Sequence, residues 1–219
     1  SAKLDFACVA DFIEQKELLT IPAEAREFLN KIENPIMREQ IKDYFLNRQF
    51  RKDIYIRGAR RLSPVVRLNK ILDTVYILMN KNPFPQTINI PLGTINLHAE
   101  LSEKIYNYLA GENYRPKSFR EFIQKNPAVP PMQVETFLIL LCHHGIIAPC
   151  QNETAINKVA NQCRALNKYI CERAKTSDEI IVLASPVTGG GFNINRQDRM
   201  FIAAIFDGKN TVDELVEYV

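Results

Sequence analysis

Apolar segments in this sequence are short, and charged residues, proline or glycine close each of them. Even the compact run Phe137–Cys142 is far below the roughly 20 apolar residues that span a bilayer. The chain has 219 residues, of which 46% are hydrophobic, so it can bury the core of one large domain or two small ones. A fold of many short elements is therefore expected, without a membrane span.

Several segments have the spacing of helices. Apolar residues recur at i, i+3, i+4 and i+7 in 68–75, after Ser63-Pro64, and in 134–141, which is the pattern of a core-facing helix. Pro22 and Pro35 suit the first turns of two earlier helices. The predicted helices are 22–31, one from Pro35, one from Pro64, 101–110, 118–124, 131–144, 154–175, 197–206 and 211–219.

Other segments are predicted to be short strands. Residues 50–58 alternate, with Phe50, Ile54 and Ile56 on one side and arginines mainly on the other, which predicts a half-buried strand. Gly189-Gly190-Gly191 separates two strand-like segments, which predicts a loose hairpin. The predicted strands are 4–10, 50–58, two pieces within 87–96, 146–150, and the segments on either side of the glycines.

Together these elements predict a helix-rich α+β fold with two parts. Residues 80–86 contain two prolines and polar residues, so we place a boundary there. Residues 1–84 are expected to form an N-terminal helical subdomain with a short strand. Residues 85–219 are expected to form a winged-helix-like subdomain followed by C-terminal helices, because three short helices and a β-ribbon occur in succession.

Composition indicates which partners and which cell compartment to expect. The net charge of +3 is too small to require a polyanionic partner. The N-terminus lacks the basic start and apolar middle of a signal peptide, and the five cysteines include no close pair, which fits reduced thiols in the cytoplasm. The chain begins without Met, so it is expected to be a segment of a longer protein.

Three features could carry chemistry, and each has a plainer explanation. The glycine cluster leads into a strand, whereas a cofactor-binding glycine loop opens a helix. Cys142, His143, His144 and Cys150 lack the spacing of zinc ligands. Adjacent helical residues such as Cys142 and His143 project about 100° apart and cannot face each other as nucleophile and base. No catalytic, cofactor-binding or metal-ligating residue is therefore assigned.

A basic cluster is the densest charged feature: Arg48, Arg51, Lys52, Arg57, Arg60 and Arg61. Such a cluster is most often a solvated surface. The alternative is docking to an acidic protein surface, for which Arg51, Arg57, Arg60 and Arg61 are the candidate partner-binding residues. Nucleic acid is disfavoured, because the expected recognition helix 131–144 contains no Lys or Arg.

Two segments resemble a known family. LNRQFRKDIYIRGARRLS (46–63), with FACVADF and REQIKDYFLNR upstream of it or overlapping its start, resembles the methyltransferase regulatory domain. ASPVTGGGFNINRQDRMFIAAIFDG (184–208) resembles the closing segment of the same prokaryotic proteins, which include rickettsial-type protein lysine methyltransferases. The resemblance implies a region that follows an S-adenosylmethionine-binding domain, modulates it or helps hold a protein substrate, and has a winged-helix-like distal part.

Three functions follow as hypotheses. The first is a non-catalytic regulatory and substrate-engaging region of an S-adenosylmethionine-dependent methyltransferase, whose partners are the catalytic domain of the same chain and possibly a protein substrate. The cofactor would be bound by that domain and not by these residues, which contain no strand-GxGxG-helix element. The second is a winged-helix nucleic-acid-binding module. The third is an enzyme with an unrecognised Cys/His site.

Overall fold

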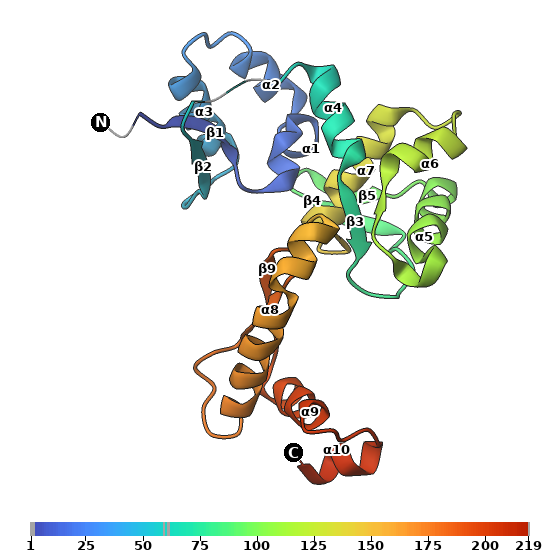
Figure 1. Cartoon of the computed structure of the whole chain (residues 1–219). Helices are drawn as coiled ribbons and strands as arrows, with labels where there is room; N and C mark the ends of the chain where they lie inside the picture. The colour runs from blue at the N-terminus through green and yellow to red at the C-terminus, as the bar shows by residue number, and fades with distance from the viewer. Residues whose placement is uncertain (1–2, 59, 61, 219) are drawn as a thin grey trace. The chain divides into compact units, whose positions relative to one another are not determined.

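The protein has a mixed α+β fold of helices and small sheets. The structure is a computed structural model and describes residues 3–58, 60 and 62–218. These residues divide into two compact units, with the division between Ala148 and Pro149 (Figure 1). Each sheet in the described part of the chain has only two or three strands.

The first unit contains most of the elements. They are β1 (Asp5–Val9), η1 (Phe12–Gln15), α1 (Glu17–Thr20), α2 (Ala23–Leu29), α3 (Pro35–Phe45), β2 (Asp53–Ile56), α4 (Pro64–Asp73), β3 (Val75–Leu78), β4 (Thr87–Ile90), β5 (Gly93–Asn96), α5 (Ala99–Tyr114), β6 (Lys117–Ser118), α6 (Phe119–Lys125), α7 (Pro131–His143) and β7 (Ile147–Pro149), whose last residue begins the second unit. The expected helices from Pro35, from Pro64 and over 131–144 are confirmed as α3, α4 and α7.

Side-chain caps fix where these helices begin. The Asn34 side chain accepts hydrogen bonds from the backbone N–H groups of Ile36 and Met37, at 3.0 and 3.1 Å. Ser63 caps α4 in the same way, and a proline occupies the first turn of both helices. Proline suits that turn because its missing N–H would have no helical partner there. Cap and proline together explain why the sequence located both starts.

Helix α7 lies in the main core. Seven of its residues are buried, and it packs against η1 and α4. Its apolar side chains join one cluster with residues of α4, β3, β4, α5 and α6. The boundary expected at residues 84/85 lies within this core, since Leu72 and Tyr76 belong to the same cluster as Ile88 and Leu97.

The strand expected at 50–58 forms, but it is not half-buried. β2 pairs antiparallel with β1 alone, in register Phe6↔Tyr55 and Cys8↔Ile54. Phe50 precedes the strand and is 91% exposed, while Ile54 and Ile56 are 44% and 40% exposed. The expectation of a half-buried strand with these three side chains on one side is therefore wrong. The face of the ribbon that carries Ile54 lies beside an open cavity, described below, and so stays open to solvent.

The second unit contains the remaining elements. They are α8 (Glu153–Arg173), β8 (Val182–Ser185), β9 (Gly190–Asn193), α9 (Arg196–Phe206) and α10 (Val212–Tyr218). β8 and β9 form the predicted hairpin, with Gly189 at φ +70° in the turn. Ile170, Cys171, Leu183 and Ala203 make its buried cluster. The helices expected at 154–175, 197–206 and 211–219 are confirmed as α8, α9 and α10.

Candidate functional site

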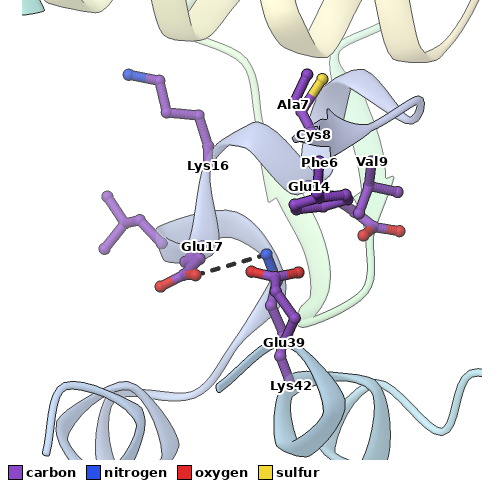
Figure 2. Close-up of a pocket in the computed structure, with 10 residues that line it drawn as sticks. Phe6, Ala7, Cys8, Val9, Glu14, Lys16, Glu17, Glu39 and Lys42 are labelled. Atoms are coloured by element: carbon purple, nitrogen blue, oxygen red, sulfur yellow. Dashed lines mark ion pairs between the residues drawn. The ribbon is translucent and has the colours of Figure 1, made fainter. Parts of the chain in front are cut away.

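The N-terminal segment up to β2 forms an open pocket lined by charged side chains. The pocket has a volume of about 410 Å³ and lies between β1, η1, α1 and α3. Figure 2 shows Glu17, Glu39 and Lys42 close together on one side of the pocket. Phe6, Cys8 and Val9 of β1 and Glu14 of η1 lie on the other side. Lys16 also lines the pocket.

Glu17 is the most strongly paired carboxylate of this pocket. Its two oxygens accept hydrogen bonds from the two terminal nitrogens of Arg38, both at 2.8 Å. The buried Lys42 adds a second cation at 3.5 Å, marked by the dashed line in Figure 2. The hydrogen bonds from Arg38 hold the pKa of Glu17 below its ordinary value, against the opposing effect of burial. This pair joins α1 to α3.

A second network joins the ribbon to α3. Arg51 pairs with Asp53 at 2.7 Å and with Asp43 at 3.0 Å, and its guanidinium lies 5.4 Å from the centre of the Phe6 ring. Arg48 pairs with Glu14 and, at 3.1 Å, with the same Asp43. Because the pairs share partners across three elements, the network fixes how the ribbon meets α3.

One carboxylate is fully buried at the edge of this region. Glu135 of α7 is 1% exposed and accepts from Lys16 Nζ and from Arg67 Nη2, each at 2.6 Å. Two cations around one carboxylate leave a net charge of +1 in this triad. The triad joins the residue before α1 to α4 and α7, so it connects the N-terminal segment to the main core.

The structure separates the four predicted partner-binding arginines. Arg51 is held in the network just described. Arg57 and Arg60 are exposed, and neither forms an ion pair with any residue that the structure describes. Arg61 lies outside the described residues. Of this set, Arg57 and Arg60 are therefore the described side chains that are open to solvent.

Sequence reasoning missed the exposed apolar residues of this segment. Phe50, Tyr44 and Ile36 are 91%, 75% and 79% exposed, and Phe6 and Tyr55 form an exposed edge-to-face pair with ring centres 5.9 Å apart. Between residues 67 and 148, in contrast, the exposed large apolar side chains are Leu92 and Met132. A single sequence gives no signal for this difference, because exposed and core apolar positions have the same spacing.

The cysteines and histidines that the sequence offered as possible catalytic or metal-binding residues are buried or contact other residues. Burial raises the pKa of the Cys142 thiol to about 12 and that of Cys150 to about 11, which disfavours the thiolate. His143 Nδ1 lies 2.9 Å from Asp11, and His144 Nε2 lies 2.9 Å from the carbonyl oxygen of Asn89. Among the described residues, no three His, Cys, Asp or Glu side chains gather closely enough to hold a metal ion.

None of the helices that the structure describes could cross a membrane.

Comparison with known proteins gives two findings. Residues 1–57 match a family model described as a predicted methyltransferase regulatory domain. The chain is also 30% identical, over 209 residues, to the uncharacterized protein sll1526 of Synechocystis sp.. That similarity covers 93% of this chain and 40% of the relative, so the chain spans well under half the length of the relative. The matched 57 residues include the ribbon, the charged pocket and the exposed aromatic residues.

Proposed function

We propose that this chain, whose residues 1–57 match the methyltransferase regulatory domain, is a non-catalytic regulatory and substrate-engaging region of a methyltransferase. It acts through protein contacts, first with the catalytic domain of the same protein and then with a protein substrate. The catalytic domain would supply the S-adenosylmethionine site. The five cysteines, none of which forms a disulfide in the part of the chain that the structure describes, suit a reducing cytoplasm.

The observation that carries this proposal is the number of exposed large apolar side chains in and just after the matched segment, which is sixteen within residues 4–66, against two within 67–148 and nine within 149–218. Large contiguous apolar surfaces on soluble proteins mark interaction sites, and aromatic residues are enriched in interface cores. The exposed large apolar residues within 4–66 are Leu4, Phe6, Phe12, Leu18, Phe28, Ile36, Met37, Tyr44, Phe45, Phe50, Ile54, Tyr55, Ile56, Leu62, Val65 and Val66. A covering partner would remove this surface from water.

Two exposed arginines follow the same segment of the chain. Arg57 follows β2 directly, and Arg60 comes three residues later. A guanidinium without an internal partner can pair with a carboxylate through two parallel hydrogen bonds. The partner surface is therefore expected to be apolar with acidic residues at its rim.

The test compares two variants in the longer protein that this proposal requires. Phe50→Ser and the double change Arg57→Glu, Arg60→Glu should each lower kcat/KM for methyl transfer at least tenfold, because they remove an exposed anchor or bring like charges together. Met132→Ser and Arg115→Glu are matched controls, since both side chains are exposed outside the matched segment.

Circular dichroism and melting of the isolated chain should be nearly unchanged in all four variants, because exposed side chains contribute little to stability. Kinetics indistinguishable from the wild type in both test variants would refute the docking role. Equal losses in the controls would show that the assay reports general damage.

The nucleic-acid alternative receives less support. The order α5, β6, α6, α7, β7 is consistent with a winged-helix-like arrangement. However, α7 would be the recognition helix, and seven of its residues are buried against the rest of the first unit. A helix must be free on one face to enter the major groove. Salt-dependent binding to duplex DNA would revive this alternative.

A further inference from the structure

A second cavity separates the β1–β2 ribbon from the main core. It has a volume of about 280 Å³. Cys8, Val9 and Ile54 line it on the ribbon side, and Ile71, Leu138 and Cys142 line it on the side of α4 and α7. Ile54 remains 44% exposed although it lines this cavity, so the cavity is open to solvent. An open, mostly apolar cavity of this kind is the usual form of a small-molecule site.

One charged side chain lines this cavity. Arg67 of α4 donates from Nη2 to Glu135, and its side chain is 42% exposed. Nη2–Glu135 is its one ion pair among the residues that the structure describes. Since Lys16 also pairs with Glu135, the triad keeps its net charge of +1. The Tyr76 hydroxyl is already committed, because it donates to the carbonyl oxygen of Ile71 at 3.2 Å.

The lining therefore defines the chemistry of a ligand. Apolar walls favour an aliphatic body, and the net positive charge of the triad, whose Arg67 lines the cavity, favours one anionic group. A polyanion is disfavoured because no second cation lines the cavity among the described residues. The small volume of the cavity suits a single alkyl chain better than a folded peptide segment.

We infer that this cavity binds a medium-chain monocarboxylate, with the alkyl chain between the ribbon and α7 and the carboxylate on Arg67. The ribbon side of the cavity belongs to residues 1–57, and the opposite side does not. A bound ligand would thus hold the ribbon onto the core helices. That the ligand regulates methyl transfer rests on the proposed function, whereas binding itself does not.

The first test uses the 219-residue chain and a homologous series of hexanoate, octanoate and decanoate, measured by calorimetry. Each added CH₂ that is buried should tighten Kd about fourfold until the cavity is full. Decanamide, which has the same chain without the charge, should bind at least tenfold more weakly than decanoate. Equal affinity of the acid and the amide, or no dependence on chain length, would overturn the inference.

Thiol labelling locates the site without any substitution. Cys8 lines the cavity, whereas Cys163 lies in the second unit and has similar partial exposure. At a decanoate concentration ten times Kd, maleimide labelling of Cys8, followed by mass spectrometry, should slow about tenfold, because only about one molecule in eleven stays free. The rate at Cys163 should not change. Equal protection of both thiols, or of neither, would contradict binding at this cavity.

Two variants complete the test. Arg67→Gln should make decanoate and decanamide bind with nearly equal affinity, and Cys8→Phe should weaken both by filling the ribbon side of the cavity. If Arg67→Gln fails to fold, Cys8→Phe still decides, because the side chain is partly exposed on the ribbon. Unchanged affinity in folded Cys8→Phe would exclude the cavity. All of these measurements use the isolated chain, so a negative result leaves the docking proposal untouched.

Discussion

At the scale of single residues, Glu135 is the clearest case of a side chain whose role depends on burial. It is one of the few charged residues that are almost fully buried here, and the other buried residues of its helix are apolar. Charged residues are almost never fully buried unless they are paired. Its position next to Val134, on a helix with a strong apolar pattern, was thus a signal available in the sequence, but the identity of its partners, Lys16 and Arg67, was not. They are 119 and 68 residues away.

Replacing Glu135 by Gln should lower the free energy of unfolding by about 3 kcal/mol, because two cations then lose a buried counter-charge. Glu121→Gln is the matched control. Glu121 also pairs with a lysine at 2.6 Å, but it is 54% exposed, so its change should have far less effect on the free energy of unfolding. Urea unfolding of both variants measures the difference. Equal losses would mean that burial does not strengthen the Glu135 triad.

Glu17 gives a prediction about pH. Because its pKa is lower in the folded protein, the unfolded chain takes up the proton first as the pH falls. The stabilisation from Glu17 is therefore complete above the ordinary glutamate pKa of about 4.3 and is lost as the pH drops through the lowered value.

The stability difference between the wild type and Glu17→Gln should accordingly be largest near pH 7 and shrink as the pH falls below the ordinary glutamate pKa of about 4.3. Thermal melts across this range measure it. Glu24→Gln serves as a control, since Glu24 is exposed and forms no ion pair among the described residues. A difference that grows on acidification would contradict the assigned role of the Arg38–Glu17 pair.

At the scale of elements, capped helices and most of the short strands were predictable, whereas β3 and β6 were not. α8 begins after Asn152, whose side chain accepts from Ala155 N at 2.8 Å, and a local sequence signal of this kind is visible without the fold. β3 was missed because Val75 continues the helical spacing of α4. Thr74 has ψ 137°, so the chain leaves the helix there and pairs with β6 more than 40 residues later. Such pairing has no local signature.

The candidate site was predictable only as a basic segment. The arginines of 48–61 were visible as a cluster, and the match of residues 1–57 falls on the same region. The sequence did not show which of these arginines form ion pairs. Arg51, for example, pairs with Asp43 of α3 only because the fold brings the ribbon and that helix together. Arg57 and Arg60, by contrast, form no ion pair with any residue that the structure describes. Tertiary contacts, more than composition, decide which charges are paired.

At the scale of the whole molecule, the two units have cores of very different size. The first unit buries a large apolar cluster around α7, whereas the second buries Ile170, Cys171, Leu183 and Ala203. Small domains are marginally stable because they bury a smaller fraction of their surface. The second unit compensates with Arg199, which is 1% exposed, donates from Nε to the carbonyl oxygen of Ile194 at 3.1 Å, and also bonds Ile180 and Asp178.

Arg199→Leu should therefore destabilise the second unit alone, by about 3 kcal/mol, because the carbonyl groups around the buried guanidinium lose their donor. Under native conditions, amide hydrogen exchange in α8 and α9 should accelerate about a hundredfold, while exchange in α7 stays unchanged. Arg196→Leu is the matched control on the same helix. Arg196 also donates to backbone carbonyls, at 2.7 and 3.0 Å, but it is exposed, so water can replace it. Equal acceleration in α7 and α8 would show that the two units unfold as one, and the separate cores would then not correspond to separate stabilities.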